Sequence, residues 1–105
     1  MRAFSVDAPA QHDLLAATVW YEERRDGLGD EFVAGVAAVF RRVRDTDEFA
    51  TAPILRVTAA VVRRERTARF PYVVYFVEDD AARRVIAVLH VRRDPNVWQA
   101  RVRAP

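Results

Sequence analysis

Arginine carries most of the chemistry that this sequence offers. All 17 basic side chains are arginines, and neither lysine nor cysteine occurs. Eleven of the arginines fall in residues 53–105 beside only five acidic residues, a net charge of +6, whereas residues 1–52 carry −4. The planar guanidinium group binds carboxylates and phosphates through paired hydrogen bonds. The C-terminal half is therefore predicted to contact an anionic partner, either a nucleic acid or an acidic protein segment.

A histidine among these arginines raises the question of catalysis. Cleavage of RNA through its 2′-hydroxyl needs a proton acceptor, cations that stabilise the charged transition state, and a proton donor to the leaving oxygen. Histidine side chains suit the proton transfers, so the candidate catalytic residues are Arg63, Arg69, His90 and Arg92. A lone histidine on an apolar strand is more often structural, and arginines more often form ion pairs. Bond cleavage by this chain is therefore the less favoured interpretation.

Other chemistry is excluded by composition and spacing. The lack of cysteine excludes disulfides, thiol nucleophiles and metal–thiolate sites. The acidic runs Glu22-Glu23 and Glu78-Asp79-Asp80 are contiguous, which suits solvated surface better than a catalytic carboxylate pair. No cofactor or metal is expected. No basic stripe lies on a helix free to enter a groove of duplex DNA, and no membrane-spanning run or signal peptide is visible, so a cytoplasmic protein is expected.

The N-terminal half is predicted to form a strand and then two antiparallel helices. Residues 2–6 are a short strand candidate. Asp7 is expected to cap a first helix over residues 10–25, with Pro9 in its first turn. A Gly-Leu-Gly segment ends that helix, and Asp30 is expected to cap a second one. The second helix repeats apolar residues at helical spacing: Phe32, Val36, Val39, Phe40 and Val43.

The C-terminal half changes to strand periodicity. Segments 57–66, 69–78 and 84–92 are rich in β-branched and aromatic residues, and short turns separate them. Short connections favour antiparallel pairing. Alternation predicts that the last strand places Val85, Ala87, Leu89 and Val91 on one face. Residues 97–102 are expected to form a short tail.

The order of elements predicts an α+β fold, β-α-α-β-β-β, in one domain over residues 1–105. A helical hairpin would pack on one face of an antiparallel sheet. Both faces of strand 69–78 are apolar, so two helices leave the second face uncovered. We expect a hydrophobic groove there, rimmed by arginines, that receives an amphipathic segment carrying acidic residues. The alternative is that Trp98 and the tail fold back over this face.

Several short patterns resemble the RelE/ParE superfamily of toxins from bacterial type II toxin–antitoxin modules. The resemblance extends over residues 4–98 and is weakest at 46–60, where no family pattern matches. The RFPY and HxRRDPxxW patterns are typical of the ParE-like branch, and the predicted element order is also the fold of that family. The patterns that carry the resemblance are Trp20-Tyr21-Glu22, Gly27-Leu28-Gly29 with Phe32, Arg63-Arg64, Arg69-Phe70-Pro71-Tyr72, and His90 through Asp94-Pro95 to Trp98.

The resemblance implies a toxin neutralised by a small cognate ParD-like antitoxin, whose C-terminal segment wraps over the sheet in a hetero-oligomer. The candidate antitoxin-binding residues are Arg63, Arg69, Tyr75, His90, Arg92 and Arg93. ParE-like toxins are associated with poisoning of DNA gyrase, so the expected activity is growth inhibition and plasmid stabilisation through binding. RelE-like relatives cut messenger RNA in the ribosome, but this chain departs from them in having no lysine and no tyrosine after Tyr75.

Two alternatives remain open at this point. The first is a ribosome-dependent endoribonuclease that uses the four candidate catalytic residues. The second is an inactive toxin-like domain that only binds its partner.

Overall fold

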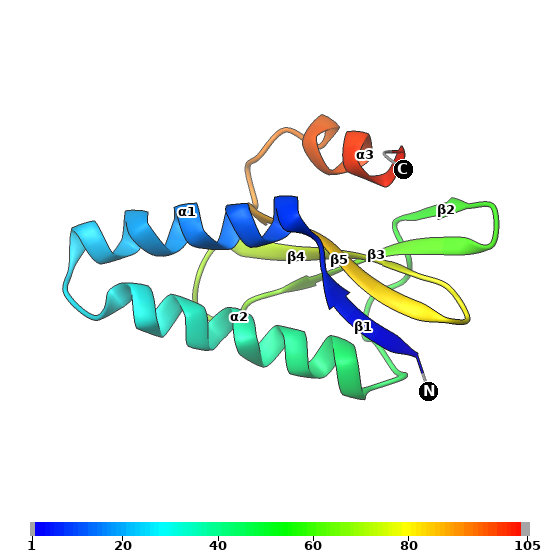
Figure 1. Ribbon diagram of the computed structural model, residues 1–105, viewed down its shortest axis with the longest axis horizontal. Coiled ribbons are helices and arrows are strands. Elements are labelled where there is room, and N and C mark those ends of the chain that lie inside the picture. The colour runs from blue at the N-terminus through cyan, green and yellow to red at the C-terminus, as the bar shows by residue number, and fades with distance from the viewer. Residues whose placement is uncertain (1, 104–105) are drawn as a thin grey trace.

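Three layers make up the fold: two helices, a five-stranded sheet, and a third helix on the opposite face of the sheet (Figure 1). The computed structural model describes residues 2–103. The strand order is β1-β5-β4-β3-β2. The α+β architecture with its β-α-α-β-β-β core is as predicted. The elements are β1 (Ala3–Val6), α1 (Ala8–Arg24), α2 (Leu28–Asp45), β2 (Leu55–Val57), β3 (Ala60–Arg66), β4 (Tyr72–Glu78), β5 (Ala82–His90) and α3 (Asn96–Arg103).

The predicted helix caps are wrong in detail. Asp7 occupies the N-cap of α1 but makes no side-chain capping bond, because its carboxylate pairs with Arg84 of β5. Helix α2 begins before Asp30, at Leu28, with Gly27 as its N-cap at φ 87°. Only glycine adopts this left-handed conformation without steric cost. Asp30 lies instead in the first turn, where a negative charge favours the helix dipole.

A close approach of backbones fixes the hairpin of α1 and α2. The backbone N–H groups of Gly27 and Gly29 both donate to the Glu22 carboxylate at 2.9 Å. A Cβ atom at Gly29 would lie 2.9 Å from the carbonyl oxygen of Thr18, so only glycine fits there. The bend therefore holds the two helices antiparallel over the sheet.

The two faces of β4 alternate as predicted. Val74 and Phe76 pack under the helical hairpin, whereas Val73 and Tyr75 belong to a second apolar cluster beneath α3. A β-bulge changes the pattern in β5, because Tyr75 pairs with Ala87 while Phe76 pairs with Val85. The extra residue between them shifts the alternation.

The predicted common face of the last strand is therefore wrong. Val85 packs on the helical side, and Ala87 and Leu89 pack on the side of α3.

Two features of the sheet differ from the predicted antiparallel meander. β1 pairs in parallel with β5, so the sheet is mixed. The predicted strand 57–66 is divided by a turn at Thr58, whose φ of 51° lies in the left-handed region. The divided segment forms the hairpin of β2 and β3, and β2 becomes an edge of the sheet.

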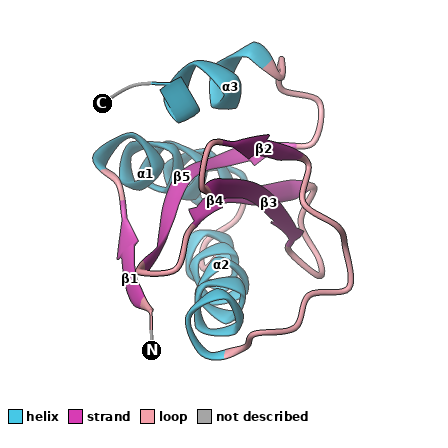
Figure 2. Cartoon of the chain, turned by 90° about the vertical axis from the view of Figure 1, so that its right-hand side faces the viewer, coloured by secondary structure: helices cyan, strands magenta, loops and turns pink. Residues whose placement is uncertain are grey.

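Helix α3 covers much of the second apolar face (Figure 2). Trp98 is buried and stacks on Tyr75, with ring centroids 5.3 Å apart and an interplanar angle of 16°. Val97 and Val102 pack against the same cluster. The expectation of a wide uncovered groove is therefore wrong. The alternative, in which Trp98 and the tail fold back over the sheet, is confirmed.

No helix within residues 2–103 is long and apolar enough to cross a membrane. Over the same residues, acidic and histidine side chains form no group that could hold a metal ion.

We expect the change Trp98→Ala to destabilise the protein by about 3 kcal/mol, because it removes a buried indole and its stack on Tyr75. Urea denaturation measures this loss. The matched control is Trp20→Ala, since Trp20 is half exposed on α1. Equal losses in the two variants would show that α3 contributes little to the packing of the sheet.

Candidate functional site

The six residues predicted to bind a partner lie at separate places on the molecule. Arg63 lies in β3, Arg69 in the turn before β4, and Tyr75 in β4. His90 ends β5, and Arg92 and Arg93 follow it. The structure therefore brings no single site together from all six, and each residue has its own set of contacts.

Arg63 belongs to a structural network at one end of the sheet. Its Nε donates to Glu78 Oε1 at 3.2 Å, and its Nη1 donates to the carbonyl oxygen of Thr51 at 3.4 Å. Its guanidinium also lies over the ring of Phe49, 5.3 Å from the centroid. These contacts occupy the guanidinium and leave it poorly placed to bind a ligand.

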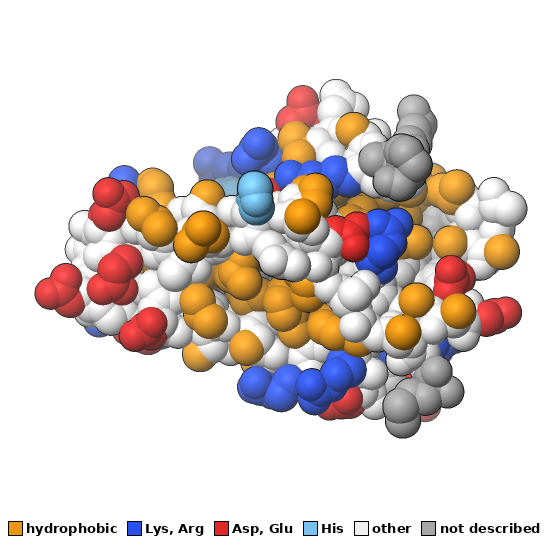
Figure 3. Space-filling model, in the orientation of Figure 1, with side chains coloured by type: hydrophobic (Ala, Val, Ile, Leu, Met, Phe, Trp, Pro, Cys, Tyr) orange, Lys and Arg blue, Asp and Glu red, His pale blue; other side chains and the backbone are white. Residues whose placement is uncertain are grey.

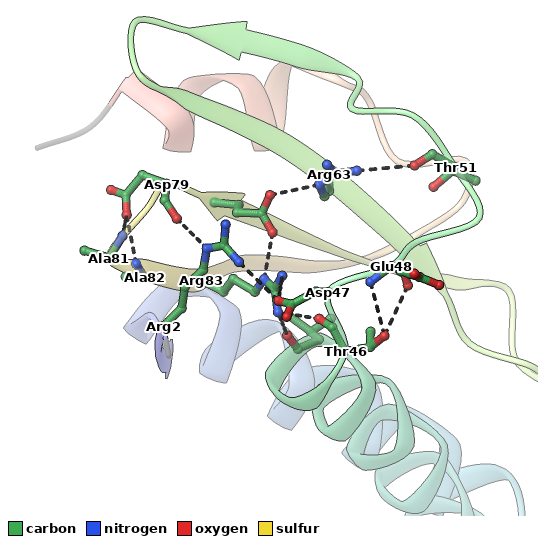
Figure 4. A network of polar contacts seen from close by, with 12 residues as sticks. Arg2, Thr46, Asp47, Glu48, Thr51, Arg63, Asp79, Ala81, Ala82 and Arg83 are labelled. Atoms are coloured by element: carbon green, nitrogen blue, oxygen red, sulfur yellow. Dashed lines mark hydrogen bonds and ion pairs between the residues drawn. The ribbon is translucent and has the colours of Figure 1, made fainter.

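Arg83 is the centre of that network, as Figure 4 shows. It is 3% exposed, and its Nε donates to Glu78 Oε2 at 2.7 Å. Nη1 donates to the carbonyl oxygens of Val43 and Thr46, at the end of α2, and Nη2 donates to Asp47 at 3.1 Å. Burial would raise the pKa of Glu78, but hydrogen bonds from Arg83 and Arg63 outweigh it and hold that pKa below its ordinary value.

Arg69 has a similar structural role at the other end of α2. Its Nη1 donates to Glu31 Oε1 at 2.5 Å, and its guanidinium lies 5.1 Å from the ring centroid of Phe70. Arg25 binds the second oxygen of the same carboxylate. These hydrogen bonds, first from Arg69 and then from Arg25, lower the pKa of Glu31. Arg69 therefore fastens the turn before β4 to the start of α2.

His90 lies beside Tyr72 on a small pocket of about 120 Å³, which Asp13 and Arg93 also line. The two rings meet edge to face with centroids 5.6 Å apart. The backbone N–H of Arg92 donates to Nδ1 of His90 at 3.0 Å, so the neutral ring carries its proton on Nε2. Burial raises the pKa of Tyr72, so its hydroxyl stays protonated at neutral pH.

The four candidate catalytic residues do not converge. Arg63 stands opposite Phe76 in the sheet, whereas His90 stands opposite Tyr72. These two residues of β4 are four positions apart, a distance of about 13 Å along an extended strand. Arg63 and Arg69 are also committed to ion pairs. This arrangement does not place a proton acceptor beside the cations that RNA cleavage requires.

A second pocket, of about 330 Å³, lies on the sheet face that carries α3. It combines an apolar floor with two arginines that the sequence prediction missed. Their position follows from alternation, since Arg64 pairs opposite Tyr75 and Arg66 opposite Val73. The residues that line the pocket are Thr51, Arg64, Glu65, Arg66, Val73, Tyr75 and Val91.

Arg64 and Arg66 differ from most other arginines in having no acidic partner. Ten arginines lie within 4.0 Å of a carboxylate oxygen: Arg2, Arg24, Arg25, Arg42, Arg44, Arg63, Arg69, Arg83, Arg84 and Arg101. Within the described part of the chain, Arg64, Arg66, Arg92 and Arg93 form no such pair, and the same holds for Arg41 and Arg56. Two unpaired guanidinium groups thus line an apolar pocket, and Arg92 follows its lining residue Val91. Such a pocket suits a carboxylate or phosphate next to an apolar group.

The sequence matches no protein-family profile, and a search among curated proteins gives no significant match. The features that bear on function are therefore the pocket, the arginines and the resemblance of short patterns.

The buried network predicts a loss of stability for Arg83→Ala. We expect about 3 kcal/mol or more in urea denaturation, because Glu78 loses its closest partner and the carbonyl groups at the end of α2 lose their donor. Arg44→Ala is the control, since its ion pair with Asp45 is exposed and such pairs contribute under about 1 kcal/mol. Similar losses of stability in Arg83→Ala and Arg44→Ala would show that Arg83 is not central to the network.

Acid should weaken the same network. A carboxyl group whose pKa is lowered by folding stabilises the protein above its unfolded pKa of about 4.3, and this contribution is lost as the pH falls below that value. We therefore expect the difference in unfolding free energy between the parent protein and Glu78→Gln to shrink from about pH 6 to about pH 3. Glu48→Gln, an exposed change, should show no such trend. A difference for Glu78→Gln that stays constant with pH would contradict the assignment.

Proposed function

We propose that this chain is a toxin of the RelE/ParE type, closest to the ParE-like branch, that acts in the cytoplasm and is neutralised by a cognate antitoxin. Its activity is binding to a target, DNA gyrase, rather than bond cleavage. The order of the elements and the helical hairpin with its glycine bend support the proposal, because both agree with the resemblance of the short sequence patterns.

The pocket with Arg64 and Arg66 carries the proposal. Val73, Tyr75 and Val91 are its apolar lining residues, and among the described residues no carboxylate lies within ion-pair distance of the two guanidinium groups. A segment with an apolar residue next to Asp or Glu would fill the pocket and bring a carboxylate to the two guanidinium groups. This is the composition expected of the inhibitory segment of an antitoxin.

Helix α3 limits how much of the sheet such a segment contacts. Trp98, Val97 and Val102 already cover the apolar cluster around Tyr75. The antitoxin is therefore expected to insert a short anchor at the pocket rather than to extend across the whole face. Arg92 and Arg93 follow Val91 and are exposed. They add positive charge beside the pocket, where acidic residues that flank the anchor of the antitoxin could bind.

Binding is favoured over cleavage by the placement of the charged residues. Arg63 and Arg69 hold elements of the fold together, and no histidine lines the pocket. Glu65 is the carboxylate among the lining residues, and Arg42 binds it at 3.4 Å, so the pocket is better suited to recognition than to proton transfer.

Induced expression in bacteria tests the proposal. We expect growth to stop with filamentation and a DNA-damage response. A short reading frame next to the gene is the place to seek the antitoxin, and co-expression of its product should restore growth. The double change Arg64→Glu/Arg66→Glu should weaken antitoxin binding at least tenfold in calorimetry. The control Arg41→Glu/Arg56→Glu alters the charge equally at two unpaired arginines outside the pocket lining, and it should bind normally.

Three outcomes would contradict the proposal in different ways. Transcripts cut at fixed codon positions would indicate a ribosome-dependent endoribonuclease. Normal growth with intact antitoxin binding would indicate an inactive binding domain. Equal weakening by both double variants would show that overall charge, and not the pocket, recognises the antitoxin.

A further inference from the structure

The small pocket beside His90 contains hydrogen-bond donors that the rest of the protein does not use. It lies where α1 meets the start of β4 and the end of β5. Tyr72, His90 and Arg93 all line it. Among the described residues, the Tyr72 hydroxyl, Nε2 of His90 and the Arg93 guanidinium have no hydrogen-bond partner. Figure 3 shows arginine side chains gathered between α1 and the start of α3, where the chain leaves β5.

The acidic side chain of the pocket is held by its own partners. Asp13 Oδ1 accepts a hydrogen bond from Arg101 of α3 at 3.0 Å. Oδ2 accepts from the same guanidinium and, at 3.0 Å, from the backbone N–H of Val88. Arg101 therefore offsets the negative charge of Asp13. The charge that stays without a partner at this pocket, among the described residues, is the positive charge of Arg93.

We propose that this pocket binds a phosphate group, either inorganic phosphate or the terminal phosphate of a monoester. A phosphate presents at least three free oxygens in tetrahedral arrangement, so donors that approach from different sides can all bind it. The planar guanidinium of Arg93 donates to two of these oxygens. The imidazole N–H of His90 and the hydroxyl of Tyr72 donate to the others. Burial raises the pKa of Tyr72, so its hydroxyl stays protonated at neutral pH and is able to donate.

The number of donors favours phosphate over other anions. A carboxylate has two oxygens in one plane, which a single guanidinium satisfies. It would leave the hydroxyl of Tyr72 and the N–H of His90 without an acceptor. A phosphodiester in a nucleic acid also has only two unesterified oxygens, and its chain continues on both sides of the phosphate. A phosphate with three or four free oxygens matches the three side chains best.

This site goes beyond the proposed function and is separate from the pocket that contains Arg64 and Arg66. No residue lines both pockets. Tyr72 packs with the cluster under the helical hairpin, whereas Tyr75 packs with the cluster under α3, so the two pockets belong to opposite faces of the sheet. Phosphate binding is therefore expected whether or not the chain acts as a toxin.

Titration with inorganic phosphate, followed by NMR of the histidine side chains, tests the inference. The chain has two histidines, and His12 is exposed on α1 outside the pocket lining, so it serves as an internal reference. We expect the imidazole signals of His90 to shift until they saturate, while those of His12 stay in place. Methyl phosphate that binds as tightly would identify a terminal monoester as the ligand, and binding of inorganic phosphate alone would identify the free ion.

Matched substitutions test the assignment of the donors. Arg93→Ala should weaken phosphate binding at least fivefold, because it removes the charged donor of the pocket. Its control is Arg92→Ala, which removes an adjacent exposed arginine that does not line the pocket. Tyr72→Phe should weaken binding about threefold and keep the packing of the ring. Tyr21→Phe is the control for the lost hydroxyl, since the Tyr21 ring lies 6.0 Å from that of Tyr72 and does not line the pocket.

Three results would overturn the proposal. The first is a His90 signal that phosphate does not shift, or that shifts only as much as the signal of His12. The second is equal weakening by Arg92→Ala and Arg93→Ala in proteins that circular dichroism shows to be folded. The third is binding of acetate or dimethyl phosphate as tight as that of inorganic phosphate. None of these measurements uses growth inhibition or an antitoxin, so a failure here is distinguishable from a failure of the toxin proposal.

Discussion

The arrangement of the layers depends on the hydrogen bonds of one buried side chain, the guanidinium group of Arg83. One side chain from β5 binds the carboxylate of Glu78 in β4, two carbonyl oxygens at the end of α2, and Asp47 in the connection that follows. A buried cation is costly unless each donor finds an acceptor, so these elements must all be in place together. The other carboxylate oxygen of Glu78 accepts a hydrogen bond from Arg63, so β3 belongs to the same network.

This network also explains why the arginines of β3 have different roles. Arg63 faces the helical side and is held by Glu78, whereas its neighbour Arg64 points to the opposite face beside Tyr75. Alternation along a strand separates a structural cation from an available one at adjacent positions. The adjacent residues Arg63 and Arg64 therefore lie on opposite faces of the sheet. The same division places Glu65 against Arg42 of α2 and leaves Arg66 at the pocket.

The helical hairpin and the alternation of β4 could be predicted because they follow from residue spacing over many positions. The bulge in β5 could not, since one extra residue between Val85 and Ala87 leaves no mark in the sequence, and the predicted face of that strand was wrong beyond it. The turn at Thr58 was missed because a threonine with positive φ gives no turn signal. Arg64 and Arg66 were overlooked for a related reason: the face of β3 is defined only once its register with β4 is known.

The third helix changes what the chain requires from a partner. Strand 72–78 is apolar on both faces, and a pair of helices covers only one of them, so the second face needs either a partner or additional residues of the chain. Trp98 supplies most of that cover by stacking on Tyr75. A partner that recognises this face can therefore contact only the part that α3 leaves uncovered. Val91 and the unpaired arginines Arg64 and Arg66 are accessible there. Recognition at such a margin depends on charge and on one or two apolar contacts, so binding should be sensitive to salt and to single arginine substitutions.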